Sequence, residues 1–196
     1  ALLSVVGTGG GSIASITEDV PNQTYTVTVD TAGDGTVALA LTDDDTINDT
    51  ASTPTLLNGA GTGVLYSNAV LVDKTDPELV SITRADPVEQ LIDNTVEFVV
   101  FRITFSDAVT GLLLGDVTST LPAIPVDSIS GAGNTWYAFC NIGGNTGTLG
   151  IAVDSGAAVV NQVGLNYAGG TPDPNETYAI AEPNAVPLSV KNWTLY

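Results

Sequence analysis

The residues in this sequence that are best suited to chemistry are aspartates, and they gather in two places. Asp43, Asp45 and Asp49 fall within one short stretch, and Asp73 and Asp76 frame a second. Calcium takes about six to eight oxygen ligands in irregular loops, so both groups predict Ca²⁺ binding. The spacing differs from that of an EF-hand, and a solvated acidic loop is the alternative interpretation.

Nucleophilic catalysis by a Ser-His-Asp or Cys-His system is excluded, because the sequence contains no histidine. Carboxylates would have to carry any reaction. Asp154-Ser155-Gly156 follows an apolar run, as half of an aspartic protease site does, and Asp30-Thr31-Ala32 is a weaker counterpart. The two aspartates occupy non-equivalent positions of an internal repeat, so we interpret both as strand ends and expect no enzymatic activity.

The repeated element is a hairpin-like unit that occurs twice. It runs from Thr24 to Leu41 and recurs from Trp136 to Val153, at a constant spacing of about 112 residues. Alternation of apolar with small or polar side chains predicts strands that have one buried and one exposed face. The positions predicted to face the core are Tyr25, Val27, Leu39, Tyr137, Phe139 and Ile151.

The same alternation places Trp136, Ala138 and Cys140 on the outward face of the second copy. An exposed tryptophan beside an exposed cysteine predicts that Trp136 and Cys140 form an interface with another module or chain. Coverage of this face by an edge of the same module is the alternative.

Strand and turn signals along the rest of the chain predict an all-β sandwich, because short apolar runs alternate with turns and no helix of ordinary length fits. Asp73–Pro77 is the predicted domain boundary, since it interrupts the alternation and carries a proline before a new strand. The apolar run Val96–Phe105 changes parity, which predicts a β-bulge near Val99–Phe101.

The composition restricts the partners. Twenty-two acidic residues against four basic ones give a net charge of −18, and this field repels nucleic acid and attracts divalent cations. No apolar stretch approaches the ~18 residues of a membrane span. Sparse lysine with many Thr, Gly, Asp and Asn residues favours an extracellular or cell-surface protein.

Three stretches together resemble the repeated bacterial Ig-like domains of large secreted and surface-anchored proteins. They are Ile103–Gly111, Asp73–Ile82, and Gly35–Leu39 with Asp43–Asp45. The resemblance covers nearly the whole chain to about residue 181 and implies two Ig-like β-sandwich modules in tandem. In phase with that family, residues 74–181 form a complete module, residues 1–73 form a partial module that lacks its first strands, and residues 182–196 form a C-terminal extension or donor strand.

The resemblance implies a non-enzymatic structural module of an extracellular assembly, a stalk or filament subunit, whose partners are copies of itself or neighbouring Ig-like modules. The alternative is an adhesin domain that binds a glycan or protein.

The last residues of the sequence suggest how copies could join. In the segment 184–196, Val186, Leu188 and Val190 alternate with smaller or polar residues, and Trp193 follows them. It predicts a strand donated into the gap of the first module in another copy. The alternatives are that preceding residues complete the first module, or that the segment finishes the second module or begins an anchor.

Overall fold

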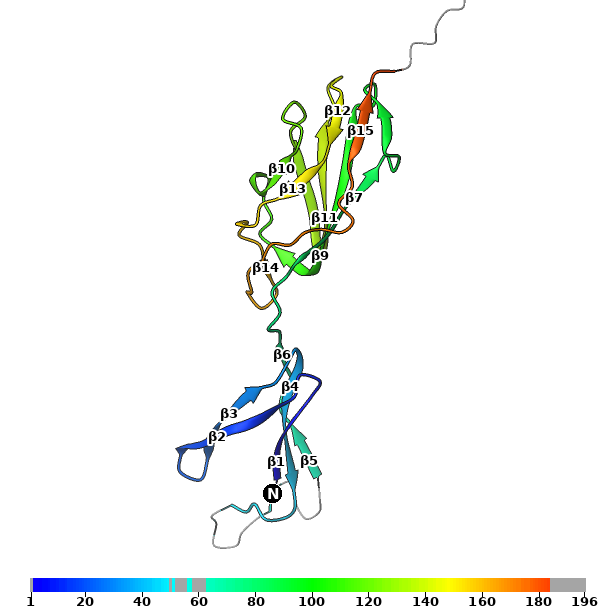
Figure 1. Ribbon diagram of the computed structural model, residues 1–196. Coiled ribbons are helices and arrows are strands. Elements are labelled where there is room, and N and C mark those ends of the chain that lie inside the picture. Colours follow the sequence, from blue (N-terminus) through cyan, green and yellow to red (C-terminus); the bar gives the residue numbers. More distant parts are fainter. Residues whose placement is uncertain (1, 50, 52–55, 58–62, 184–196) are drawn as a thin grey trace, which may run out of the picture. The chain divides into compact units, whose positions relative to one another are not determined.

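A computed structural model of the chain describes residues 2–49, 51, 56–57 and 63–183 (Figure 1). The chain divides into unit 1, Ala1–Thr75, and unit 2, Asp76–Tyr196, and this division falls inside the segment Asp73–Pro77. The regular elements of the described residues are strands, apart from the single 3-10 turn η1 (Leu114–Asp116), so the predicted all-β class is confirmed. This part of the chain contains no helix with the length and apolar character of a membrane span.

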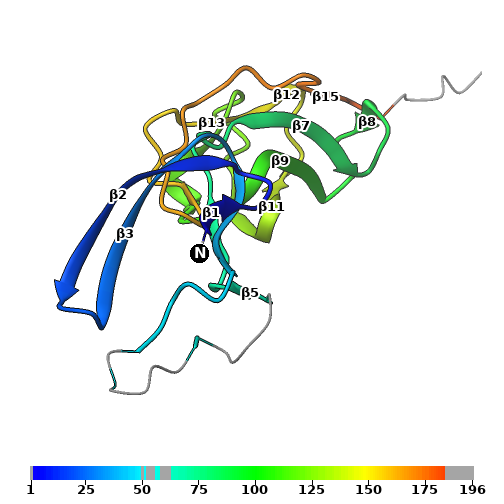
Figure 2. The same cartoon turned by 90° about the horizontal axis from the view of Figure 1, so that it is seen from below.

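The described residues of unit 1 form two small sheets. One is built on β4 (Gly35–Asp43), which pairs antiparallel with β1 (Leu2–Val6), β5 (Gly63–Tyr66) and β6 (Val70–Val72). The other is the antiparallel pair of β2 (Gly11–Val20) and β3 (Thr24–Thr31), which lie side by side in Figure 2. The two strands of the predicted hairpin-like unit, β3 and β4, therefore belong to different sheets, and the expectation that they pair is wrong.

Unit 2 is built from two layers. In the larger sheet, β9 (Phe98–Thr110) pairs antiparallel with β7 (Leu79–Asp86), β11 (Ser128–Asn141) and β14 (Val160–Asn161). In the other layer, β15 (Tyr178–Ala181) pairs antiparallel with β12 (Gly147–Leu149) and parallel with β8 (Leu91–Asp93), while β13 (Ile151–Val153) pairs with β10 (Val117–Ser119). As in unit 1, the repeated unit crosses between layers at its turn.

The core of unit 2 forms between these layers. Alternate residues of β9 point into it, and Val99, Phe101, Ile103 and Phe105 are at most 1% exposed. The ring of Phe101 meets that of Tyr178 from the opposite layer edge to face, with ring centroids 5.0 Å apart. Such a pair stabilises the fold by about 0.5–1.5 kcal/mol beyond the burial of its area.

The predicted bulge near Val99–Phe101 is wrong for β9. The register between β9 and β11 is regular from Phe98 to Thr104, and one parity of β9 supplies the core throughout. The extra residue lies in the partner strand instead, at Ala85 of β7. The sequence is misleading here because β9 also carries apolar residues on its outer face, of which Phe98 is 48% exposed.

The predicted facing is wrong for β11, the first strand of the second repeat copy, whereas Ile151, after the turn, is 1% exposed as predicted. Ala138 and Cys140 are fully buried, and Trp136 packs against the core, whereas Tyr137 and Phe139 are only half-buried. The register explains this, because directly opposed residues share a face of the sheet. Ala138 and Cys140 lie opposite core residues of β9.

The cause of the error is one residue in the turn. The second copy turns through Gly143–Gly147, which is one residue longer than Ala32–Gly35 in the first copy. A constant spacing therefore aligns the strands after the turn correctly and misaligns the strands before it by one position. A slip of one residue turns every side chain of a strand to the other face, so Val27 corresponds to Ala138 and not to Phe139.

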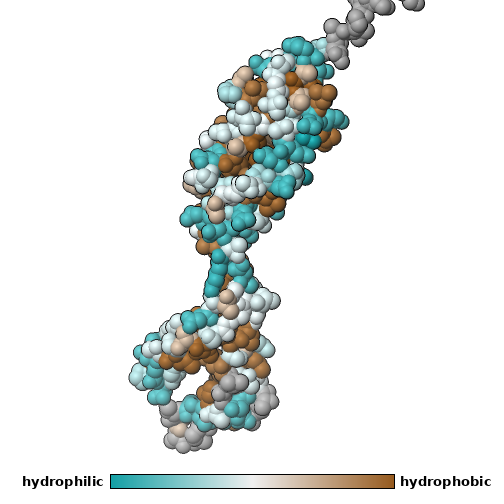
Figure 3. All heavy atoms as spheres, viewed as in Figure 1, coloured by the Kyte–Doolittle hydropathy of each residue, from teal (hydrophilic) through white to brown (hydrophobic). Residues whose placement is uncertain are grey.

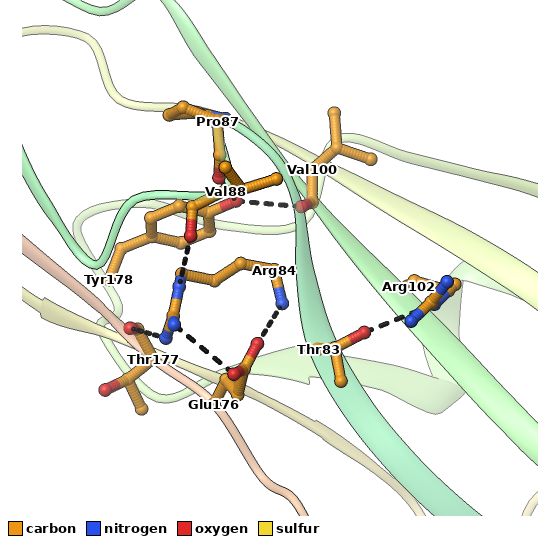
Figure 4. A network of polar contacts seen from close by, with 9 residues as sticks. All are labelled: Thr83, Arg84, Pro87, Val88, Val100, Arg102, Glu176, Thr177 and Tyr178. Atoms are coloured by element: carbon orange, nitrogen blue, oxygen red, sulfur yellow. Dashed lines mark hydrogen bonds and ion pairs between the residues drawn. The ribbon is translucent and has the colours of Figure 1, made fainter.

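A polar network joins the two layers of unit 2 (Figure 4). The backbone N–H and Nη2 of Arg84 in β7 donate to the carboxylate of Glu176, at 2.7 and 3.3 Å. The same guanidinium donates through Nη1 to the carbonyl of Thr177 and through Nε to that of Val88. Arg84 thus ties its own strand to the segment that leads into β15.

The hydroxyl of Tyr178 makes a second set of polar contacts between the layers (Figure 4). Its hydroxyl lies 2.7 Å from the carbonyl oxygen of Pro87 and 3.0 Å from that of Val100. Burial raises the pKa of Tyr178 to about 12. The hydroxyl therefore stays protonated at any ordinary pH, and its single hydrogen is shared between these two carbonyl oxygens.

Candidate functional site

Asp43 is the most constrained of the aspartates predicted to bind calcium. It ends β4 and is 0% exposed. Its Oδ1 accepts the backbone N–H of Asp45 at 3.0 Å, in a tight turn where Asp45 has a positive φ of 62°. In the part of the chain that the structure describes, Oδ2 of Asp43 has no hydrogen-bond partner. A buried carboxylate oxygen without a partner costs free energy, so this atom is the best candidate for contact with a cation.

The other predicted ligands do not gather around Asp43. Asp45 and Asp49 follow it in the same loop, whereas Asp73 comes directly after β6, which pairs with the opposite end of β4. Asp76 is exposed and belongs to unit 2. Among the described residues, no three His, Cys, Asp or Glu side chains lie close enough together to hold a metal ion. Calcium binding stays a prediction.

Asp34 fixes the last residues of unit 1, although its sequence signal is only that of a turn residue. It lies between β3 and β4, and its Oδ1 accepts the backbone N–H of Lys74 at 2.7 Å. Oδ2 accepts the hydroxyl of Thr75 at 2.6 Å, and Lys74 Nζ donates to the carbonyl of Thr31 at 2.6 Å. The hydrogen bond from Thr75, followed by that from Lys74, lowers the pKa of Asp34.

We expect these contacts to weaken in acid. A carboxyl group whose pKa is lowered in the folded state stabilises that state above its unfolded pKa, and the contribution is lost as the pH falls through the folded pKa. In an NMR titration, the Asp34 carboxyl carbon and the Lys74 amide should move together, below the usual value of 3.8. Asp34→Asn should abolish the titration of the Lys74 amide. A common midpoint at or above 3.8 would contradict the assignment.

Cys140 was predicted to be an interface residue, but it lies inside unit 2. Its side chain is 0% exposed in the core of unit 2. Burial, with a smaller effect of the Asp127 charge, raises the pKa of the thiol from 9.0 to about 12. Cys140 therefore contributes to core packing and offers no surface to another chain.

Cys140 is expected to be inert toward thiol reagents in the folded protein. The thiolate is the reactive form, and a pKa of about 12 instead of 9.0 lowers its fraction about a thousandfold at pH 8. Ellman's reagent should react only as unit 2 unfolds in denaturant. Val29→Cys, at the corresponding half-buried position of unit 1, should react rapidly without denaturant. Rapid reaction of the unaltered chain would overturn the inward placement of Cys140.

Unit 1 has an open apolar face between its two sheets. A cavity of about 270 Å³ is lined there mainly by Val29, Thr31, Val37, Leu39, Val70 and Val72. Of the residues that line the cavity, Val70 is 63% exposed, and unit 1 also exposes other large apolar side chains, including Tyr66 at 69%. Figure 3 shows apolar residues in brown on the side of unit 1 that faces the viewer.

Unit 2 has a larger hollow of about 690 Å³ beside the β8–β15 pair. Its lining mixes the carboxylates of Glu89, Asp93 and Glu182 with the apolar side chains of Leu91 and Val96. Leu91 is 70% exposed. The hollow thus presents apolar contact area beside negative charge.

Comparison with protein-family models, with curated proteins and with solved structures finds no match to this chain. The remaining predicted interface residues, Val186, Leu188, Val190 and Trp193, lie outside the described residues.

Proposed function

We propose that this protein is a non-enzymatic structural module of an extracellular surface assembly, a stalk or filament subunit built from tandem Ig-like β-sandwiches. The observation that supports this most strongly is the repetition of strand pairings. β1 pairs with β4 as β10 pairs with β13, and β6 pairs with β4 as β15 pairs with β12. Successive copies of one unit that packs as a β layer are typical of repetitive structural proteins.

The order of strands in unit 2 supports the Ig-like part of the proposal. In an Ig-type sandwich, strands A, B and E share one sheet, while C, F and G share the other. In chain order, β7, β9 and β11 occupy the positions of A, B and E, whereas β10, β12 with β13, and β15 occupy those of C, F and G.

The extracellular location is the part of the proposal that is simplest to test. Antibodies raised against the purified chain should label intact cells of the producing organism, and electron microscopy should place the label on surface structures. Labelling that requires permeabilised cells would contradict the proposal.

We further propose that Ca²⁺ binds in the loop that begins at Asp43. The support is the buried Oδ2 atom, which has no partner among the described residues. Ca²⁺ at about 100 times its Kd should stabilise unit 1 by about 2.7 kcal/mol, which a rise in Tm would reveal. Asp43→Asn should abolish the rise, whereas Asp30→Asn, on β3 of the same unit, should preserve it. A Tm that is indifferent to both Ca²⁺ and chelator would exclude the site.

The second candidate function is that of an adhesin domain that binds a ligand. The hollow beside β8 and β15 favours it, because its volume of about 690 Å³ lies in the range of small-molecule sites. Its carboxylates would accept hydrogen bonds from sugar hydroxyl groups. Binding on a glycan array that is lost in Asp93→Ala would support this function, and a blank array would count against it.

A further inference from the structure

Unit 1 leaves open the sheet edge that unit 2 covers with β9. In the described part of the chain, β3 pairs only with β2, so its second edge carries no partner strand. The corresponding strand of unit 2, β11, pairs with β9 from Phe98 to Thr104. An unpaired edge presents a row of N–H and C=O groups that can accept a further strand.

The side chains beside this edge are less buried in unit 1 than in unit 2. Val27 and Val29 are half-buried, whereas their counterparts Ala138 and Cys140 are 0% exposed. In unit 2, Ala138 lies opposite Phe101, and Cys140 lies opposite the next inward residue of β9. Among the described residues of unit 1, no strand places large apolar side chains opposite Val27 and Val29 as β9 does opposite their counterparts.

Burial also differs on β4, the strand on the other side of the cavity. Leu39 of β4 is half-buried, whereas its counterpart Ile151 is 1% exposed. The cavity of about 270 Å³ lies between Leu39 and β3. It is therefore located where unit 2 places the side chains of β9.

We infer that the open face of unit 1 binds an extended strand with the apolar alternation of β9, antiparallel to β3. The inference deepens the proposed function and rests on it, because it names the partner through which such modules associate. Addition of a strand would pair the free edge, and its alternate side chains would fill the cavity. The equivalence sets the register: a residue like Phe101 lies opposite Val27, and one like Val99 lies opposite Val29.

Charge favours a strand of this kind over an acidic one. The outward residue Arg102 of β9 lies opposite Tyr137, whose counterpart in unit 1 is Thr26. The hydroxyl of Thr26 donates to Asp19 at 2.7 Å. A basic residue at the Arg102 position would therefore lie near a carboxylate, in a chain of net charge −18.

The test uses the full chain carrying Val29→Cys and a synthetic peptide with the sequence of residues 96–110. At about ten times its Kd, the peptide should slow labelling of the new thiol about tenfold by mass action. The native thiol at 140 serves as an unreactive internal reference. A peptide carrying Phe101→Asp and Ile103→Asp should give no protection.

Acceptor variants test the face. Val27→Asp should abolish binding of the peptide in fluorescence anisotropy, whereas Thr28→Asp, on the exposed outer face of β3, should preserve it. If Val27→Asp unfolds unit 1, which circular dichroism would show, protection of the Val29→Cys thiol decides alone.

Two outcomes overturn the inference. One is protection by a peptide of residues 184–196 with none by the β9 peptide, which would assign the face to the tail of a second copy. The other is the absence of protection by either peptide at millimolar concentration. Neither result affects the surface-labelling experiment, so the proposed function and this inference fail separately.

Discussion

Phe101→Ala should lower the free energy of unfolding of unit 2 by about 3–5 kcal/mol, the cost of removing a fully buried aromatic side chain. Phe101 is 0% exposed and packs edge to face on Tyr178. Its neighbour on the paired strand β11 is Ala138, which is too small to fill the space that the substitution would leave. The surrounding layers are sheets fixed by their hydrogen bonds, so we expect little collapse around the vacated volume.

Denaturant titration monitored by the fluorescence of Trp136, which packs against this core, would measure the loss. The matched control is Phe98→Ala, on the outer face of the same strand and 48% exposed, which should cost about 1 kcal/mol or less. Similar losses for the two variants would show that the core assignment of β9 is wrong. Because the chain has two units, the transition of unit 2 must be followed separately.

Arg84→Met should be the next most damaging change, at about 2 kcal/mol. It removes the guanidinium partners of Glu176 and of two backbone carbonyl groups. The side chains of Arg84 and Glu176 are 16% and 30% exposed, so water compensates for only part of the loss. The cost comes mainly from the carboxylate that is left without its charged partner.

Arg102→Met is the control for this experiment. Arg102 lies on the adjacent strand, is exposed, and donates one hydrogen bond of 3.2 Å to Thr83, so its loss should be within about 0.5 kcal/mol. The double variant with Arg84→Met and Glu176→Gln should recover part of the stability, since it removes the orphaned charge. If Arg84→Met costs no more than Arg102→Met in urea denaturation, the network does not hold the layers together.

Local pattern was sufficient to predict the all-β class and the approximate position of several strands. The Thr and Val alternation after Thr24 marks β3, and the apolar run from Val96 marks β9. These elements are predictable because a sheet with one buried face imposes a period of two on the sequence. The proline and paired aspartates around Thr75 likewise mark the place where the two units divide.

Which face of each strand is buried, and which strands pair, could not be predicted from the alternation of apolar and polar residues alone. Both depend on the lengths of turns and on how the chain crosses between sheets. One additional residue in the turn before Gly147 inverted the faces assigned to β11. The pairing of β3 with β2, and not with β4, is decided by the crossing of the chain between sheets. The partners of Asp34 lie about 40 residues away, and nothing in the local sequence marks them.

The parallel pairing of β8 with β15 has a consequence for unit 2 under tension. The N–H of Ala179 donates to the carbonyl of Gln90, and the N–H of Asn94 donates to that of Ala181. Once β7 has detached from β9, pulling unit 2 from its two ends would draw these parallel strands past each other along their length. The hydrogen bonds would then be loaded together in shear and would have to break at once, which resists extension better than successive unzipping. A subunit of a stalk exposed to flow would gain tensile strength from this short contact.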